Sequence, residues 1–454
     1  MTYDLIVIGG GPAGYLASER AGHGGLKTLL IEKEKIGGVC LNRGCIPTKT
    51  LLYSAKLKDG AANGKKYGVT AEAVTLDHKA VVRRKNKVVK KLTAGVKMAV
   101  KGHGVEIVDG EAVIKGKNDE GYMVEVGGET YVGKRLMIAT GSSPAVPPIP
   151  GLKEGLDSDF VLTSREMLDI KEVPPRLVVI GGGVIGMEMA SYFNSAGSEV
   201  TIIEMLPKIG GAIDSDIADI LQKNYEKKGI NFELSSRVTE IKEGSVVYEK
   251  DGESHTIEAD KVLLSVGRRA NSDGIGLESI GVVTDRGMIK VDERQLTNQP
   301  NVYCAGDVNG RSMLAHTAYR QAEVAVNNML GKQDVMRYDA IPGVIYTNPE
   351  VAGVGETKQT ATEKGMDVTE KVITMNYSGR YMAENEGGDG IIKIIVNNEK
   401  NTLCGVHIIG NYASEIIISA GIMIATEMSI EEIKFQVFPH PTVSEVIREA
   451  VFQL

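Results

Sequence analysis

Two stretches of the sequence share one pattern, YDLIVIGGGPAG at residues 3–14 and RLVVIGGGVIG at residues 176–186. Each is an apolar run that ends in a cluster of glycines, which is typical of a strand that leads into a tight turn. A second apolar run follows each stretch and ends in an acid, Glu32 in the first copy and Glu204 in the second. In both copies the acid lies 23 positions after the first glycine. The chain therefore contains an internal repeat.

The repeated pattern predicts two dinucleotide-binding folds. The first glycine allows the turn from strand to helix, the second lets the backbone approach a pyrophosphate, and the third lets helix and strand pack closely. The helix N-terminus offers N–H groups and partial positive charge to the pyrophosphate, and the distal acid accepts hydrogen bonds from ribose hydroxyls. Two dinucleotides on one chain indicate a redox relay between a tightly held cofactor and a diffusible one. The glycines are Gly9, Gly11 and Gly14, then Gly181, Gly183 and Gly186.

The second copy indicates which nicotinamide cofactor binds. The carboxylate of Glu204 would repel a 2′-phosphate, and no arginine follows in EMLPKIGGAID (204–214) to neutralise one. NAD is therefore favoured over NADP.

Three further apolar runs end at glycines. RLMIATGSSP (135–144) and KVLLSVGRRAN (261–271) are interpreted as the last strands of the two nucleotide units, and NVYCAGDVNG (301–310) as another strand. An acid at the end of this last strand is suited to hold a cofactor hydroxyl. The residues concerned are Gly141, Gly267, Gly306 and Asp307.

The composition limits the class of protein. A chain of 454 residues is too long for one core and predicts two to four domains. Its net charge of −7 argues against nucleic acid as the main partner. No apolar run approaches the ~20 residues of a membrane span, and the N-terminus shows no basic leader, so we expect a cytoplasmic enzyme. One basic segment, residues 83–102, predicts a helix with a solvated face; a contact for an acidic protein is the alternative.

Two of the four cysteines, Cys40 and Cys45, lie in GGVCLNRGCIPTKT (37–50). A zinc half-site is disfavoured, because the spacing is wide and Cys304 and Cys404 stand alone. Two buried thiols that pack as small hydrophobes are a second interpretation. A redox-active dithiol is the third, and it is favoured.

Geometry constrains that third interpretation. Five residues of regular helix rise about 7.5 Å, while a disulfide needs Cα atoms within about 4.4–6.8 Å. A bridge between Cys40 and Cys45 therefore requires distorted backbone, and Gly44 and Pro47 are residues that break helical regularity.

With the two glycine motifs and the AGD of residues 305–307, GGVCLNRGCIPTK (37–49) resembles the redox signature of the class I pyridine nucleotide–disulfide oxidoreductases. The resemblance covers essentially the whole chain. It implies an α/β protein with two Rossmann-like domains, FAD on the first motif, NAD on the second, and an α+β C-terminal domain that forms a homodimer. The implied domains are 1–145 with 273–338 for FAD, 146–272 for NAD and 339–454 for the interface.

A general base is needed because a cysteine thiol with an ordinary pKa near 8.5 is mostly protonated at neutral pH. The segment FPHPTVSEVIREAVFQL (438–454) offers His440, with Glu445 five residues on to fix its tautomer. The segment also resembles the His-Pro-Thr-x-x-Glu motif of the family, in which the histidine reaches the disulfide of the other subunit. For the remaining histidines a structural role is favoured, namely for His23, His78, His103, His255, His316 and His407.

The resemblance assigns further residues. Lys49 matches the lysine beside the flavin and Glu188 its partner, while Ala315 in RSMLAHTAYRQA (311–322) contributes a backbone N–H to the flavin. The full set of expected FAD contacts is Gly9, Gly11, Pro12, Ala13, Gly14, Glu32, Lys33, Gly38, Val39, Lys49, Gly110, Ala112, Thr140, Gly141, Gly306, Asp307, Leu314 and Ala315. The expected NAD contacts are Gly181, Gly183, Val184, Ile185, Gly186, Glu188, Glu204, Val238 and Gly267, and no metal site is expected.

Within the family, the chain is most similar to the members that oxidise dihydrolipoyl groups carried by 2-oxo acid dehydrogenase or glycine-cleavage complexes. A glutathione-reductase-like enzyme is an alternative that the NAD-type Glu204 disfavours. A flavoprotein that senses redox state without turnover is another, and it leaves His440 and Glu445 without a role. Two residues of the redox motif, Val39 and Arg43, depart from the small or apolar residues common there.

Overall fold

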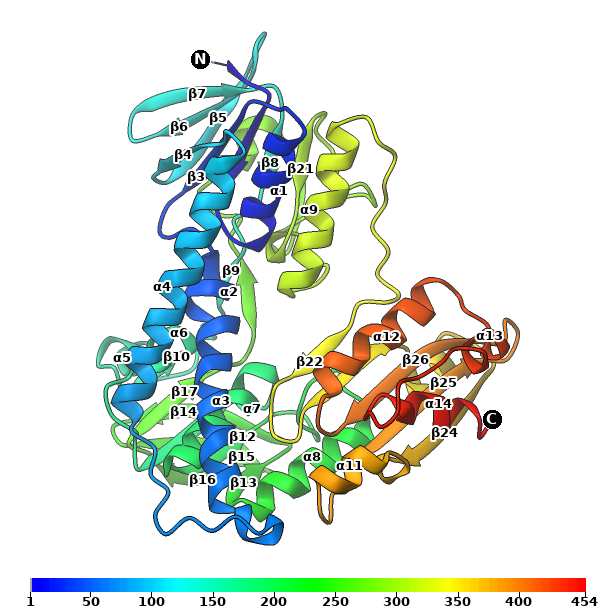
Figure 1. Cartoon of the computed structure of the whole chain (residues 1–454). Helices are drawn as coiled ribbons and strands as arrows, with labels where there is room; N and C mark the ends of the chain where they lie inside the picture. The colour runs from blue at the N-terminus through cyan, green and yellow to red at the C-terminus, as the bar shows by residue number, and fades with distance from the viewer. Residues whose placement is uncertain (1) are drawn as a thin grey trace. The chain divides into compact units, whose positions relative to one another are not determined.

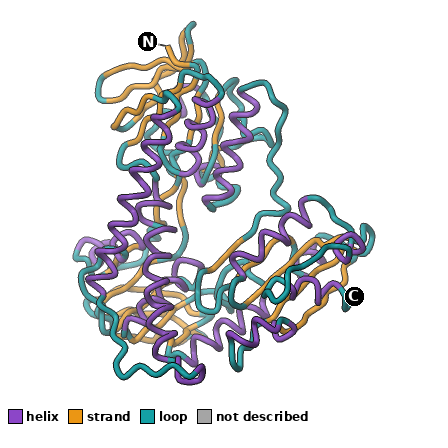
Figure 2. The backbone as a smooth tube through the Cα atoms, in the orientation of Figure 1, coloured by secondary structure: helices purple, strands orange, loops and turns teal. Residues whose placement is uncertain are grey.

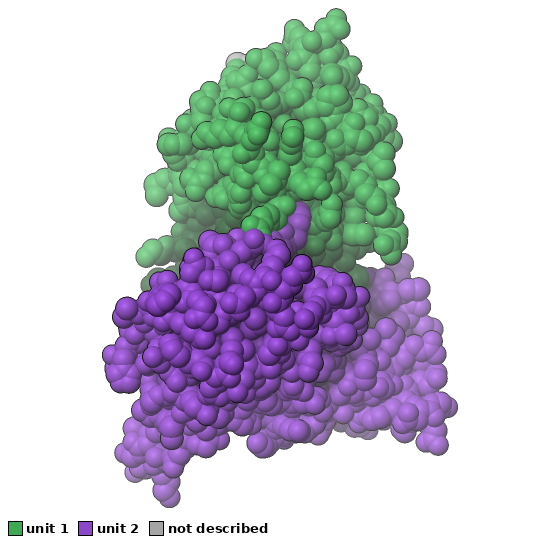
Figure 3. All heavy atoms as spheres, turned by 90° about the vertical axis from the view of Figure 1, so that its right-hand side faces the viewer, with its two compact units in different colours: residues 1–50, 82–145, 267–337 green, residues 51–81, 146–266, 338–454 purple. Residues whose placement is uncertain are grey.

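The computed structural model describes residues 2–454, and the chain divides into two compact units, each described below by itself (Figure 3). Unit 1 contains the residues up to Thr50 together with 82–145 and 267–337. Unit 2 contains residues 51–81, 146–266 and 338–454.

A five-stranded parallel sheet forms the centre of unit 1. Its middle strand β2 (Leu5–Ile8) is the apolar run LIVI, and all four of its residues are buried. Strands β3 (Thr28–Glu32) and β4 (Glu106–Asp109) follow on one side of β2, and β8 (Leu136–Ile138) and β21 (Val302–Cys304) on the other. Such fully apolar strands are typical of a parallel sheet that is covered on both faces.

Helices and small sheets surround this centre. Helix α1 (Pro12–His23) packs against α9 (Ala315–Met329), and the small residues Ala17, Ala21, Ala322 and Ala325 lie in the same apolar cluster. The remaining elements of the unit are α2 (Gly38–Arg43), the start of α3 (Cys45–Ala62), most of α4 (His78–Gly102), the sheet β1 (Thr2–Tyr3), β7 (Glu129–Gly133), β6 (Gly121–Val126) and β5 (Ala112–Asn118), and the pairs β9 (Ser142–Pro144) with β18 (Arg268–Ala270) and β19 (Thr284–Asp285) with β20 (Met288–Ile289).

Unit 2 contains a second five-stranded parallel sheet with the same arrangement. Strand β11 (Arg176–Ile180) lies in the middle, between β12 (Glu199–Ile203) with β13 (Ile230–Glu233) and β17 (Lys261–Leu264) with β10 (Val161–Thr163). Its other elements are α5 (Leu152–Asp157), α6 (Ser164–Met167), α7 (Val184–Ala196), α8 (Ser215–Lys227) and the antiparallel sheet of β14 (Ser236–Lys242), β15 (Ser245–Lys250) and β16 (Glu253–Glu258).

The C-terminal part of unit 2 is an antiparallel sheet with helices packed against it (Figures 1 and 2). Helix α12 (Ala413–Ala425) packs on β23 (Val351–Gly355) and β26 (Thr402–Ile409), and α14 (Glu445–Val451) packs on β25 (Ile391–Asn397). The apolar side chains of both helices join one buried cluster with this sheet. The other elements are β22 (Gly343–Ile345), β24 (Val368–Thr374), α10 (Lys358–Glu363), α11 (Gly379–Glu384) and α13 (Ile430–Lys434).

These elements confirm the predicted fold class, two Rossmann-like folds followed by an α+β region. One detail differs from the predicted strand assignment. As predicted, β17 is the last strand of its sheet along the chain, but the last strand of the other sheet is β21, which pairs with β8. Within residues 2–454 no helix is long and apolar enough to cross a membrane.

The two units do not coincide with the three predicted domains. Residues 51–81 belong to unit 2, because Leu51, Leu52 and Val81 pack in one cluster with apolar side chains of β11 and α7. The second Rossmann-like fold, called the NAD-type fold after its predicted cofactor, and the C-terminal region belong to unit 2. The division into three domains stays a prediction. The basic segment 83–102 is helical as predicted and largely exposed, although Lys85 is buried.

Candidate functional site

The first glycine turn follows β2 and has room only for glycine. Gly9 has a φ of +103°, which is rare for residues with a side chain, and a Cβ there would lie 2.3 Å from the carbonyl oxygen of Ala139. A Cβ on Gly14 would lie 1.7 Å from the carbonyl oxygen of Gly9. Glycine at both positions is therefore required for α1 to pack this closely against the strand that precedes it.

The second glycine turn, after β11, repeats this geometry. Gly181 has a φ of +102°, and a Cβ there would lie 2.6 Å from the carbonyl oxygen of Ser265. A Cβ on Gly186 would lie 2.0 Å from the carbonyl oxygen of Gly181. Both turns predicted from the sequence are thus present.

The two distal acids are fixed beside their turns by backbone donors. Glu32 accepts the N–H of Gly10 at 2.6 Å and that of Glu34 at 2.7 Å, one on each carboxylate oxygen. Glu204 accepts the N–H of Gly182 at 2.6 Å and that of Leu206 at 2.8 Å in the same way. Each carboxylate oxygen keeps acceptor capacity, so a ribose hydroxyl can still donate to it.

The helix N-termini at both turns are suited to a pyrophosphate. Helices α1 and α7 begin after Gly11 and Gly183, and neither N-terminus is capped by a side chain. The first N–H groups of each helix are therefore available to phosphate oxygens. A Cβ on Gly183 would meet no atom within 4 Å, so this glycine leaves open space at the turn. The residues at both turns fit dinucleotides.

The Gly306–Asp307 turn of unit 1 is held by residues that no sequence motif marks. The Gly306 N–H donates to the Gln321 side chain of α9 at 2.7 Å, and the Ser142 hydroxyl donates to Asp307 at 2.5 Å. The largely buried guanidinium of Arg268 donates to Ser142 and lies 3.9 Å from Asp307. Burial lowers the pKa of Arg268, and the negative charge of Asp307 opposes that shift. Ser142 and Asp307 are 165 positions apart in the chain, so no short sequence motif indicates their hydrogen bond.

The remaining predicted FAD contacts lie at the same ends of the strands or at the surface of unit 1. Lys33 pairs with Glu111 at 3.1 Å on the exposed surface, which leaves its role untested. The others lie as follows: Pro12 and Ala13 in the first turn of α1, Gly38 and Val39 at the start of α2, Gly110 bonded to the carbonyl of Glu32, Ala112 at the start of β5, Thr140 and Gly141 after β8, and Leu314 and Ala315 at the start of α9.

Of the predicted NAD contacts, all but one lie in unit 2. Val184 and Ile185 begin α7, directly after the turn, and Val238 is a buried residue of β14. Gly267 belongs to unit 1, where its carbonyl accepts the N–H of Ala145 at 2.9 Å. Its contact with NAD stays a prediction.

The two cysteines of the redox motif lie on either side of a break between helices. Helix α2 ends at Arg43, Gly44 adopts a non-helical conformation (φ −145°, ψ −108°), and α3 begins at Cys45. This is the backbone distortion that a bond between the two sulfur atoms requires. Cys40 and Cys45 are hydrogen-bonded thiols, and this hydrogen bond and burial raise the pKa of Cys40, while the Lys49 ammonium opposes the shift.

Two interactions near the dithiol could not be found from the sequence pattern. Arg43, which departs from the expected motif, forms an ion pair with Glu34 at 2.5 Å. The hydroxyls of Tyr15 and Tyr319 are hydrogen-bonded to each other, and both rings pack in the apolar cluster that contains Leu41 next to Cys40.

The predicted base and its carboxylate lie together in unit 2. His440 Nδ1 lies 2.9 Å from Glu445 Oε1, and the other oxygen of Glu445 accepts the N–H of Thr442 at 2.8 Å. Because a carboxylate only accepts, Nδ1 carries the proton and Nε2 is left as an acceptor. Burial alone would raise the pKa of Glu445, but the Thr442 N–H and His440 outweigh it and lower the pKa. The His440 side chain is 77% exposed, so Nε2 is accessible.

Lys49 and Glu188 belong to different units, so their pairing stays a prediction. Glu188 is buried in α7 and accepts the N–H of Tyr346 at 2.9 Å. Among the other histidines, His78 bonds to Tyr192 at 2.8 Å, and His407 bonds to a backbone carbonyl at 2.9 Å. Both are buried, as the structural role predicts.

Two family models match the chain. Residues 3–322 match the pyridine nucleotide-disulphide oxidoreductase family, and residues 341–451 match the dimerisation domain of the same family. The chain therefore belongs to the pyridine nucleotide-disulphide oxidoreductase family and is an enzyme, an oxidoreductase. The match over 341–451 fits a homodimer.

Curated relatives of the chain within this family are dihydrolipoyl dehydrogenases. The dihydrolipoyl dehydrogenase of Mycoplasma genitalium is 38% identical over 99% of this chain and 98% of its own length. The dihydrolipoyl dehydrogenase of Geobacillus stearothermophilus is 39% identical over 98% of this chain and 95% of its own length.

Solved structures share the fold over nearly the whole chain. The HOCl-induced flavoprotein disulfide reductase RclA from Escherichia coli is 27% identical, with a TM-score of 0.86 and coverage of 99% of both chains. LpdA from Mycobacterium tuberculosis is 24% identical, with a TM-score of 0.90 and coverage of 99% of both chains. The second likeness concerns the fold alone.

Proposed function

We propose that this chain is a dihydrolipoyl dehydrogenase, which oxidises protein-bound dihydrolipoamide to lipoamide and reduces NAD+. The observation that carries the proposal is the hydrogen-bonded pair Cys40 and Cys45 across the break at Gly44, in the unit of the first glycine turn. Curated relatives with this name, 38–39% identical over almost the whole chain, support it.

The two cofactors are assigned to the two turns. FAD is held by the turn of Gly9 with Glu32 and by Asp307, and NAD by the turn of Gly181 with Glu204. When bound, FAD supplies a two-electron acceptor between the dithiol and NAD+. Lys49, beside Cys40, contributes a positive charge that favours negative charge on the thiolate and on a reduced flavin. Glu188 is assigned as the partner of Lys49.

The proton step belongs to His440. Its Nε2 accepts a proton from a dihydrolipoyl thiol, while Nδ1–H stays bonded to Glu445, which stabilises the imidazolium. The exposure of the ring suits an action on the disulfide of the partner subunit, as the family resemblance implies. Each active site is then formed by two chains.

The dithiol step balances in atoms and electrons. The substrate thiolate attacks Cys40 Sγ of the oxidised pair, a mixed disulfide forms, and Cys45 leaves as a thiolate. The second substrate thiol attacks the first substrate sulfur, the lipoamide disulfide closes, and the released Cys40 takes up the proton that this thiol gives up. The pair Cys40–Cys45 gains the two electrons that the substrate loses.

The partners follow from the substrate. We assign the lipoyl domain or lipoyl carrier protein of a 2-oxo acid dehydrogenase or glycine-cleavage complex as the source of dihydrolipoamide, and a homodimer as the working form. The cytoplasmic location expected from the sequence is part of this proposal.

The test is NADH formation from free dihydrolipoamide with NAD+ or NADP+. The wild type is expected to use NAD+, and Cys45→Ser is expected to lose this activity while it keeps its flavin. Cys404→Ser is the matched control, because Cys404 lies in β26 and its thiol donates to the Ile395 carbonyl in the same sheet. Full activity in Cys45→Ser would overturn the proposed role of the dithiol.

A second candidate is a disulfide reductase of another substrate, which the likeness to the flavoprotein disulfide reductase RclA favours. It predicts that NADH reduces glutathione disulfide or another small disulfide faster than lipoamide. The rates of NADH oxidation with lipoamide and with glutathione disulfide, measured under the same conditions, distinguish the two candidates.

A further inference from the structure

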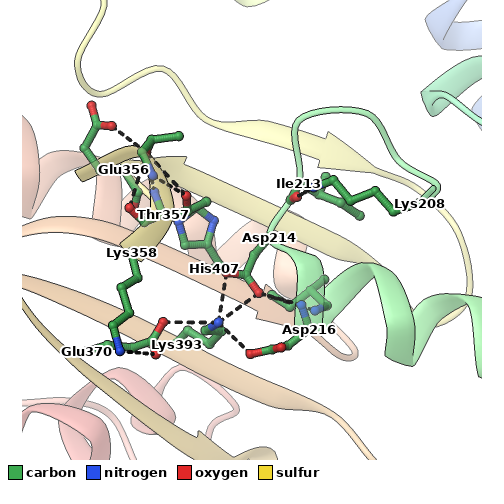
Figure 4. A network of polar contacts seen from close by, with 12 residues as sticks. Lys208, Ile213, Asp214, Asp216, Glu356, Thr357, Lys358, Glu370, Lys393 and His407 are labelled. Carbon is green, nitrogen blue, oxygen red and sulfur yellow. Dashed lines mark hydrogen bonds and ion pairs between the residues drawn. The ribbon is translucent and has the colours of Figure 1, made fainter. Parts of the chain in front are cut away.

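A buried lysine in the C-terminal sheet of unit 2 is surrounded by carboxylates (Figure 4). Lys393 in β25 is 4% exposed, although its neighbours in the strand form the apolar run IIKIIV. Its ammonium lies 2.9 Å from Asp214, 2.8 Å from Asp216 and 3.1 Å from Glu370. Burial alone would lower the pKa of Lys393, but the hydrogen bonds to Asp216 and Asp214 outweigh it and raise the pKa.

The main partner of Lys393 comes from the NAD-type fold. Asp214 is itself buried and is the N-cap of α8, where it accepts the backbone N–H of Asp216 at 3.1 Å and that of Ile217 at 3.4 Å. Both of its oxygen atoms also accept from Lys393, at 3.0 and 2.9 Å. The lysine thus fixes the residue at which the loop 205–213 ends and α8 begins.

That loop starts at the acid of the second glycine turn and returns to the turn. Leu206 donates its N–H to Glu204, and the Gly210 N–H donates to the Gly182 carbonyl at 2.8 Å. The Lys208 ammonium donates to the Ile213 carbonyl at 2.5 Å. The loop is therefore tied to the NAD turn at its start and middle, and to β25 at its end.

Two features show why the end of the loop needs an anchor. Gly210 and Gly211 have φ values of +77° and +64°, so this part of the loop has the conformational freedom of glycine. Met205 and Leu206 are 65% and 48% exposed, so little apolar burial holds the first residues. Ile209 is buried and Ile213 packs against the same apolar cluster, and the ion pairs at Asp214 add to these contacts to fix the loop where it enters α8.

We propose that Lys393 is a positioning residue for NAD: through Asp214 it holds the loop 205–213 against the Gly182–Glu204 turn. This inference rests on the proposed function for the identity of the nucleotide. Its consequence is that a residue of the C-terminal region sets the affinity of a site in the NAD-type fold of the same unit.

The test is Lys393→Met, which keeps the length of the side chain and removes its charge. The Michaelis constant for NAD+ is expected to rise about tenfold, which is about 1.4 kcal/mol of binding, with that for dihydrolipoamide and kcat changed less than about twofold. Hydrogen exchange of residues 205–214 in the nucleotide-free protein is expected to become faster. Lys371→Met, on the neighbouring strand β24, is the matched control and leaves both measurements unchanged.

A second variant separates positioning from stability, because removing one partner of a buried ion network leaves charges unpaired. In Lys393→Met with Asp214→Asn and Glu370→Gln, the buried charge is removed and Asn still caps α8. The melting temperature is expected to return toward wild type, while the loop stays unanchored and NADH binding stays weak. Wild-type NADH affinity in either variant, or equal losses for both substrates, would overturn the inference. NADH titration and hydrogen exchange need no turnover, so this outcome is independent of the test of dihydrolipoamide activity.

Discussion

The two glycine turns of this molecule have nearly the same structure, but the segments that follow them differ. The Gly37 N–H returns to the Gly10 carbonyl at 2.8 Å, and the Gly210 N–H returns to the Gly182 carbonyl at the same distance. Beyond that point the first copy continues into α2 and the dithiol, whereas the second continues into α8 and its anchor to Lys393. The shared part has the geometry that fits a dinucleotide, and the two copies differ in the segment that follows it.

The sheets of the two copies differ in the origin of one strand. The outer strand beside β17 is β10 (Val161–Thr163), which precedes the second glycine turn in the chain. The outer strand beside β8 is β21 (Val302–Cys304), which comes from after the whole second fold. The same spatial order is thus reached by two chain orders.

The largest effect is expected from a methyl group at the third glycine of each turn. Gly14→Ala and Gly186→Ala place a Cβ within 1.7 and 2.0 Å of a carbonyl oxygen, and we expect each to cost about 3 kcal/mol of stability. Gly14→Ala is expected to lose flavin, and Gly186→Ala to keep flavin but lose NAD+ binding. Flavin absorbance per chain and NADH titration measure this. Gly95→Ala in α4, where a Cβ meets nothing, is the control; flavin loss in Gly186→Ala would break the assignment of the two turns.

A smaller effect is expected at the distal acids. Glu32→Gln and Glu204→Gln each weaken two hydrogen bonds from the backbone to a charged group, a kind worth about 1.5–3 kcal/mol. Glu204→Gln is expected to reduce the preference for NAD+ over NADP+ about tenfold, because the repulsion of a 2′-phosphate is removed. Glu32→Gln is the control within the comparison and should leave that preference unchanged. The ratio of kcat/KM for the two nucleotides measures the effect, and an unchanged ratio in Glu204→Gln would contradict it.

The smallest effect is expected where the copies differ by one hydroxyl. Ser265 donates to the carbonyls of Ile180 and Gly181 at 3.0 Å, while Ala139 occupies the corresponding position beside Gly9. Because the first turn forms without this hydroxyl, Ser265→Ala is expected to cost only about 1 kcal/mol or less. Urea unfolding of both proteins measures the difference. A loss as large as that of Gly186→Ala would show that the two turns are held differently.

Features encoded within a few residues could be predicted from the sequence. The glycine turns follow from local spacing, the break between the cysteines from Gly44, and the hydrogen bond from His440 to Glu445 from a separation of five residues. Each depends on backbone geometry over one or two turns of chain, which short motifs determine.

Features formed between distant residues could not be predicted. The bond of Ser142 to Asp307 and the pairing of β21 with β8 join residues more than 160 positions apart. Lys393 did carry a signal, since a charged residue inside the apolar strand IIKIIV indicates a buried partner. The sequence does not indicate which carboxylates pair with Lys393, because that depends on how the C-terminal sheet packs on α8.

The late arrival of β21 sets an order for assembly during translation. Ribosomes release the chain from its N-terminus, so the sheet that is encoded second has all five strands once residue 264 has emerged, while the sheet that is encoded first must wait for residue 304. Until then β8 is an edge strand with unpaired backbone groups. The first Rossmann-like fold therefore keeps an unpaired strand edge for longer than the second, although it leaves the ribosome first.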